Sequence, residues 1–296
     1  MTTDRNRIRV ALQKSGRMAE GSLNLLKNCG LHVARGKDQL LCRIKELPID
    51  VLLVRDDDIP HFVNSGICDL GIVGENVFAE EKNGTANFDA VILERLGFSA
   101  CRLVIAVPEE DPANNVAGLA NKTIATSYPH LLQAFLNEQN VAASTLEMTG
   151  SVEVAPRLKI ADAICDIVAS GATLAANGLR ELTTVLYSEA LLIRSNRKIP
   201  TEKETIIQRL VARMRGTIQA EDSKYIMLHA NKGRLEEIIE LLPGAESPTI
   251  VPLQGCKDKL AVHAVCRESV FWETMEQLQE AGASSILVLP IEKMMA

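Results

Sequence analysis

The sequence predicts an α/β fold in which a two-lobed core is followed by a small C-terminal domain. Short apolar runs typical of buried strands, such as 8–12, 48–54 and 68–74, alternate with helical patterns. The polar stretch 109–115 predicts a crossing into a second lobe, and the strand-like segment 182–194 predicts the return to the first. A lobe inserted within another leaves a cleft, where proteins commonly bind small molecules.

The last third of the chain predicts a separate domain. A long amphipathic helix is expected over 206–218, where apolar residues recur at helical spacing. Strands and helices then follow in the order βαββαβ, which is typical of a ferredoxin-like unit. We therefore expect the first lobe to comprise residues 1–107 and 187–222, the second lobe residues 108–186, and the ferredoxin-like domain residues 223–296.

Composition excludes several classes of protein. The 296 residues are 47% hydrophobic and 24% charged, as in ordinary globular proteins, and the net charge of −6 argues against a nucleic-acid partner. No apolar run is long enough to cross a membrane, and the first residues lack the apolar segment of a signal peptide. Seven cysteines without a C-x-x-C pair favour reduced thiols in a cytoplasmic protein, and the five histidines have no metal-ligand spacing.

The stretch 162–178 is the strongest candidate for a binding site. A buried strand is expected to end near Asp166, and the chain then breaks at Ser170-Gly171-Ala172-Thr173 before a short helix that Asn177-Gly178 closes. Backbone N–H groups, the positive end of the helix and two hydroxyls would all point at one spot, which suits a phosphate. A carboxylate one step upstream suits the hydroxyls of a phosphorylated sugar. The alternative is an ordinary turn capped by Ser or Thr, and the absence of a Lys after the glycine excludes a Walker loop.

Two other polar segments follow predicted strands. Lys14 and Arg17 lie in the loop after the first strand, where α/β proteins place ligand contacts, although a solvated turn is the alternative. Asp56, Asp57 and Asp58 suggest a metal site, but acids before an apolar helix are more typical of a helix cap.

The order of these motifs identifies a family. The chain resembles ATP phosphoribosyltransferase, the first enzyme of histidine biosynthesis, in its long form. The resemblance covers nearly the whole chain and rests on Gln13-Lys-Ser-Gly-Arg17, Val54-Arg-Asp-Asp-Asp-Ile-Pro60, Asp69-Leu-Gly-Ile-Val-Gly74, Ala125-Thr-Ser-Tyr-Pro129, Gly150-Ser-Val-Glu-Val-Ala-Pro-Arg157, the loop after Asp166, Glu246-Ser-Pro-Thr249 and Ala283-Ser-Ser-Ile-Leu287.

The resemblance implies a periplasmic-binding-protein-like pair of lobes and a C-terminal regulatory domain. It also implies Mg²⁺, inhibition by histidine and a homo-hexamer, with dimeric forms also possible. A separate regulatory subunit, which the short form of the family needs, is not expected.

The implied reaction joins adenine N1 of ATP to C1 of the ribose of phosphoribosyl pyrophosphate and releases pyrophosphate. Asp166 and Glu153 are the candidate catalytic carboxylates, and the metal ligands stay unassigned. Phosphoribosyl pyrophosphate would bind at Asp166, Ser170, Gly171, Ala172, Thr173 and Leu174; ATP at Lys14, Arg17, Asp69, Gly71 and Tyr128; and histidine at Ser247 and Thr249.

Two other classes are weighed against this one. A two-lobed binding protein for a small anion would use the same cleft but should carry an export signal. A ligand-sensing transcription factor would need a helical DNA-binding module or a basic stretch. The sequence shows none of these features.

Overall fold

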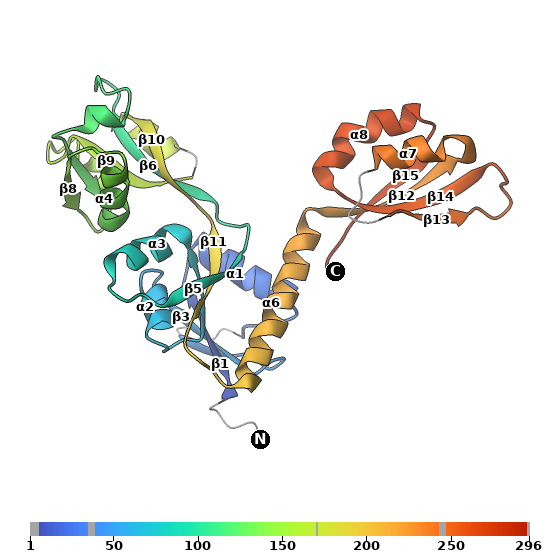
Figure 1. The fold of residues 1–296 in the computed structure, drawn as a ribbon, viewed down its shortest axis with the longest axis horizontal. Coiled ribbons are helices and arrows are strands. Elements are labelled where there is room, and N and C mark those ends of the chain that lie inside the picture. Colours follow the sequence, from blue (N-terminus) through green and yellow to red (C-terminus); the bar gives the residue numbers. More distant parts are fainter. Residues whose placement is uncertain (1–5, 35–38, 170, 243–246, 295–296) are drawn as a thin grey trace. The chain divides into compact units, whose positions relative to one another are not determined.

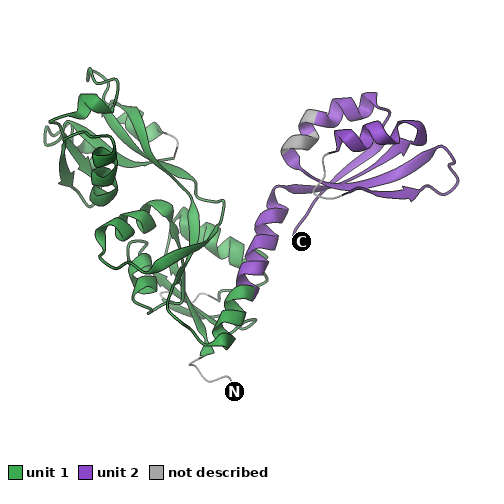
Figure 2. Ribbon diagram, viewed as in Figure 1, with its two compact units in different colours: residues 1–208 green, residues 209–296 purple. Residues whose placement is uncertain are grey.

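A computed structural model describes residues 6–34, 39–169, 171–242 and 247–294. The chain divides into two compact units, residues 1–208 and 209–296 (Figure 2). The first unit contains two sheets and the second unit one (Figure 1).

The first sheet of unit 1 has the strand order β2-β3-β1-β4-β11-β5. Strands β1, β3 and β4 are parallel, whereas β11 runs antiparallel between β4 and β5. Its strands are β1 (Ile8–Gln13), β2 (Leu41–Arg43), β3 (Ile49–Val54), β4 (Leu70–Gly74), β5 (Ala90–Arg95) and β11 (Ala190–Ser195), and its helices are α1 (Arg17–Asn28), α2 (Asp58–Asn64) and α3 (Glu75–Gly84).

The second sheet of unit 1 has the order β10-β6-β9-β7-β8. Strands β7, β8 and β9 are parallel, and β6 runs antiparallel between β9 and β10. Its strands are β6 (Cys101–Pro108), β7 (Thr123–Thr126), β8 (Ser144–Glu147), β9 (Ala163–Val168) and β10 (Leu179–Ser188); its helices are α4 (Pro129–Glu138) and α5 (Ala172–Ala176), with 3₁₀ turns η2 (Val116–Leu119) and η3 (Val152–Val154).

The two sheets share one plan. In each, three parallel strands are followed by an antiparallel strand that has just crossed from the other lobe: β6 in the second sheet and β11 in the first. The first crossing therefore lies between β5 and β6, at residues 96–100, and not in the polar stretch 109–115. The second crossing is at Glu189, so the single strand that the sequence predicts over 182–194 is two strands in different sheets.

The strand at the first crossing is buried on both faces, which explains its continuous apolar sequence. Leu103, Ile105 and Val107 pack against α4, whereas Val104 and Ala106 pack with Val152 and Leu174 on the opposite face. A strand that is buried on both faces has no polar face, so its sequence does not indicate which sheet it joins. The sequence predicts that the first lobe ends at residue 107. All of β6, however, belongs to the second sheet.

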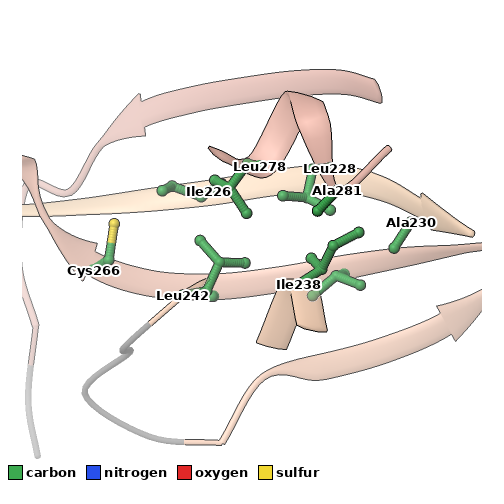
Figure 3. Close-up of a cluster of buried hydrophobic side chains, with 10 residues drawn as sticks. Ile226, Leu228, Ala230, Ile238, Leu242, Cys266, Leu278 and Ala281 are labelled. Carbon is green, nitrogen blue, oxygen red and sulfur yellow. The ribbon is translucent and has the colours of Figure 1, made fainter. Parts of the chain in front are cut away.

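Unit 2 begins within α6 (Thr201–Glu221) and has the predicted βαββαβ order. The antiparallel sheet order β13-β14-β12-β15 is that of a split βαβ unit. Ile226, Leu228 and Ile238 lie in its core with Leu242 and Leu278 (Figure 3). The elements are β12 (Ser223–Asn231), η4 (Lys232–Arg234), α7 (Leu235–Leu241), β13 (Thr249–Pro252), β14 (Lys259–Arg267), α8 (Glu268–Glu280) and β15 (Ser284–Pro290).

The structure also bears on the predicted thiols and on membranes. All seven cysteines are free, and five of them are buried. Among the described residues, no helix combines the length and apolar character that a membrane span requires.

Candidate active site

The loop after β9 has the geometry of an anion site. Gly171 adopts a left-handed conformation with φ of 77°, and α5 begins directly after it without a side-chain cap. A helix start leaves its first N–H groups without partners inside the helix, and the helix dipole makes that end positive. The N–H groups of Ala172, Thr173 and Leu174 therefore lie where the cradle is predicted, whereas Ser170 lies outside the described residues.

A cavity of about 330 Å³ opens beside this loop. It brings together the carboxylates of Asp166 on β9 and Glu153 on η3, the loop after β9, and Arg17 from the start of α1 in the other lobe. Of the predicted residues, it is lined by Arg17, Glu153, Asp166, Gly171, Thr173 and Leu174.

The charges in this cavity are arranged around Asp166. Burial raises the pKa of Asp166, the N–H of Ile167 at 2.8 Å lowers it, and the nearby charge of Glu153 raises it again. A carboxylate that is partly removed from water exerts a stronger field on a neighbouring charge than a solvated one does. The cavity therefore combines a helix start that suits an anion with a partly buried carboxylate.

A second cavity of about 240 Å³ is also lined by residues of both lobes. Arg17 lines both cavities, and Asp56, Asn76 and Tyr128 line the second. The amide of Asn76 donates to the Tyr128 hydroxyl at 2.9 Å. Burial raises the pKa of Tyr128, so its phenol stays protonated at neutral pH.

Three residues predicted to bind ATP do not line these two cavities. Lys14 is exposed in the loop after β1. Asp69 precedes β4, at the amino end of the strand, and its two carboxylate oxygens accept from Lys203 Nζ at 2.8 and 2.9 Å. Gly71 lies in the core, where a Cβ atom would stand 2.6 Å from Ile59 Cγ2. Asp69 and Gly71 thus have structural roles, in an ion pair and in the packing of α2 on β4.

The run Asp56-Asp57-Asp58 precedes and begins α2. Asp57 is the N-cap residue, but its side chain makes no capping hydrogen bond. Asp58 lies in the first turn, where a negative charge interacts favourably with the helix dipole. No group of three or more His, Cys, Asp or Glu residues suited to a metal occurs in the described part of the chain.

Some residues of the site have no signal in the sequence. Asn76, in the first turn of α3, lines the second cavity, and Glu80 of the same helix contacts the start of α4. Asn76 follows a glycine-rich strand that predicts only a helix start, so its contact with Tyr128, far along the chain, could not be found from spacing.

The residues predicted to bind histidine lie in unit 2. Ser247 and Thr249 are exposed, and Thr249 begins β13 opposite His263 of β14. Glu246, which precedes them, lies outside the described residues.

The fold and the cavities define a class of protein: a two-lobed α/β protein whose facing loops suit a phosphorylated sugar and a second anionic ligand. Similarity to known protein families and sequences agrees with this class. The family model described as ATP phosphoribosyltransferase matches residues 55–216, and a model described as HisG, C-terminal domain, matches residues 220–293. An ATP phosphoribosyltransferase of Maricaulis maris (strain MCS10) is 54% identical over 98% of this chain and 99% of its own length.

Solved structures show the same core fold. A chain of the ATP phosphoribosyl transferase (HisG:HisZ) complex from Thermotoga maritima is 24% identical, with a TM-score of 0.61 over 72% of this chain and 98% of that one. Tv2483 bound to L-arginine is 12% identical, with a TM-score of 0.50 over 73% of this chain and 87% of that one. These structures confirm the predicted two-lobed fold.

The chain belongs to the ATP phosphoribosyltransferase family and has its long form, with the C-terminal domain. It is accordingly a glycosyltransferase that carries out the first step of histidine biosynthesis. The family and activity predicted from the motifs are confirmed.

Proposed function

We propose that the cavity beside α5 binds phosphoribosyl pyrophosphate. The observation that carries this proposal is the uncapped start of α5 in one cavity with Asp166 and with Arg17 from the other lobe. The N–H groups of Ala172, Thr173 and Leu174 and the Thr173 hydroxyl bind the 5-phosphate, and Asp166 and Glu153 face the ribose.

In the reaction, the N1 lone pair of adenine forms a bond to C1 of the ribose as the bond from C1 to the pyrophosphate oxygen breaks. Positive charge develops on the ribose, and the carboxylates of Asp166 and Glu153 stabilise it. Adenine N1 carries no proton, so no general base is needed for attack. Lys14, in the loop after β1, and Arg17, at the start of α1, hold the phosphates of ATP or the departing pyrophosphate.

ATP then occupies the second cavity. Arg17 lines both this cavity and the first one. Tyr128 offers an aromatic face and a protonated hydroxyl there, held by Asn76. Asp69 and Gly71 are left out of this set because an ion pair and core packing account for them.

The residues present fit a bound Mg²⁺. Magnesium keeps several waters and binds through substrate phosphates with one or two carboxylates, so a dedicated cluster is not required. Asp166 and Glu153 line one cavity and raise each other's electrostatic energy, which a cation there would lower. When bound with the diphosphate, Mg²⁺ neutralises charge on the leaving group.

Regulation and assembly complete the proposal. Histidine binds unit 2 at Ser247 and Thr249 and inhibits the enzyme. The enzyme is a cytoplasmic homo-hexamer, and it needs no separate regulatory subunit. We keep the limit near residue 222 between the catalytic and regulatory domains, and we place the lobe limits at the crossings at 96–100 and 189.

The experiment is a pyrophosphate-release assay with ATP, phosphoribosyl pyrophosphate and Mg²⁺, with and without histidine. Thr173→Ala should raise KM for phosphoribosyl pyrophosphate about tenfold or more, because a hydrogen bond to a charged group contributes about 1.5–3 kcal/mol. Ser144→Ala, which removes an exposed hydroxyl at the amino end of β8, is the matched control. A Thr173→Ala enzyme with the wild-type KM would place the phosphate elsewhere.

A further inference from the structure

Helix α4 begins without a cap from its own residues. Its N-cap position is Tyr128, whose side chain makes no capping hydrogen bond, and Pro129 follows at the first helical position. The N–H groups of the next residues need an acceptor, and Ser, Thr, Asp or Asn at the N-cap normally supplies it.

Glu80 supplies that acceptor from the other lobe. Its Oε1 accepts from the His130 N–H and its Oε2 accepts from the Leu131 N–H, each at 2.8 Å. Oε1 also lies 2.8 Å from Nδ1 of the His130 ring. Glu80 lies on α3, whereas α4 follows β7 of the second sheet, so one carboxylate satisfies a helix start across the two lobes.

Three residues on one face of α3 contribute to this contact. Asn76, Glu80 and Gly84 are spaced four residues apart, which places them on one side of the helix. Asn76 donates to the Tyr128 hydroxyl, Glu80 caps the helix, and Gly84 lets the His130 ring approach: a Cβ atom on Gly84 would stand 2.6 Å from His130 Cε1.

The joint is accessible to water. Glu80, Tyr128 and His130 line a cavity of about 390 Å³, and the Glu80 side chain is 16% exposed. On separation, the carboxylate and both N–H groups would be solvated, and a cap typically contributes only about 0.5–2 kcal/mol. Glu80 therefore contributes a modest but measurable stabilisation to the start of α4.

We propose that Glu80 is a positioning residue: it caps α4 from the opposite lobe and thereby fixes Tyr128 in the second cavity. The inference rests on the proposed function only where it assigns ATP to Tyr128. The contact itself is independent of that assignment, so the two can fail separately.

Hydrogen–deuterium exchange of the full-length protein tests the contact. In Glu80→Ala, amides at the start of α4, residues 130–133, should exchange roughly three- to thirtyfold faster. This range is the capping free energy converted into a ratio of exchange rates. Glu80→Gln keeps one acceptor and should lie between Glu80→Ala and the wild type. Glu138→Ala removes an exposed carboxylate near the other end of α4 and should leave these amides unchanged. Unchanged exchange in Glu80→Ala overturns the proposal.

Kinetics separate positioning from local stability. Glu80→Ala should raise KM for ATP roughly three- to tenfold, with a smaller change in KM for phosphoribosyl pyrophosphate, since the cap holds Tyr128 and not the loop after β9. Faster exchange with wild-type KM for ATP overturns the positioning role. If Tyr128→Ala also leaves KM for ATP unchanged, the assignment of ATP to Tyr128 fails, and the cap is judged by exchange alone.

Discussion

The helix after the third parallel strand begins differently in the two lobes. In the first lobe, α3 follows β4, and the N–H groups of Glu75 and Asn76 donate to the Glu189 carbonyl at 2.9 Å and to Ser188 Oγ at 3.1 Å. In the second lobe, α5 follows β9, and its start lies beside a cavity, without a side-chain cap. The strand orders correspond and both helix starts line a cavity, but the first N–H groups of α3 have protein acceptors, whereas the start of α5 has no capping side chain.

This difference shows what topology leaves undecided. The fold places both helix starts at the carboxyl ends of parallel strands, where α/β proteins bind ligands. A helix start binds an anion only if its N–H groups have no protein acceptor. The acceptors at the crossing, residues 188–189, convert the first start into a structural joint.

The largest expected effect comes from the carboxylate of the open site. Asp166→Asn should lower kcat about a hundredfold, the magnitude found when one preorganised charge-stabilising group is removed, with a smaller effect on substrate binding. Single-turnover rates measure it. A rate near that of the wild type would favour a role for Asp166 in shaping the loop through its bond to the Ile167 N–H.

Stability provides an independent readout of the same variant. Burial raises the pKa of Asp166, so ionisation disfavours the folded state, and this destabilisation grows as pH rises through the raised pKa. Asp166→Asn should therefore raise Tm at neutral pH and leave it nearly unchanged in acid. A lower Tm at neutral pH would contradict the view that function keeps this charge at a cost in stability.

The next largest effect is expected at Gly171, the residue with a left-handed conformation before α5. Gly171→Val should reduce kcat/KM for phosphoribosyl pyrophosphate about 10–100-fold, because a β-branched residue resists a positive φ and displaces the N–H groups. Among the described residues, a Cβ atom there would have only Glu181 Oε1 within 4 Å, at 3.7 Å, so crowding is not the cause. Gly233→Val, at a glycine of η4 in unit 2 with no atom near its Cβ position, is the control.

Ser188→Ala tests the occupied helix start. The buried Ser188 hydroxyl accepts from the Asn76 N–H and donates to Asn76 Oδ1, so its loss should lower the free energy of unfolding by about 1–3 kcal/mol. KM for phosphoribosyl pyrophosphate should change little. Urea unfolding and steady-state kinetics measure the two effects, and a large change in that KM with unchanged stability would break the contrast between the lobes.

The smallest effect on uninhibited activity is expected in unit 2. Ser247→Ala with Thr249→Ala should weaken inhibition by histidine while leaving the uninhibited rate nearly unchanged, since both residues lie outside the catalytic unit. Calorimetric titration with histidine and an inhibition curve check it. Unchanged histidine affinity and inhibition would place the effector site elsewhere.

The sequence by itself determined the features that depend on neighbouring residues. The loop from Asp166 to Leu174 and the βαββαβ order of unit 2 follow from hydrophobic period, glycine positions and helix-start chemistry, all of which act within a few residues. The order of several modest motifs then sufficed to identify the family.

Only the tertiary structure decided which strand joins which sheet and which distant side chains meet. Glu189 alone separates β10 from β11, so nothing local marks the change of sheet, and β6 is apolar on both faces. Arg17 reaches the cavity of Asp166, Lys203 pairs with Asp69, and Glu80 caps α4 through contacts between residues far apart in the chain. The free energies of such contacts depend on the assembled geometry and leave no periodic trace in the sequence.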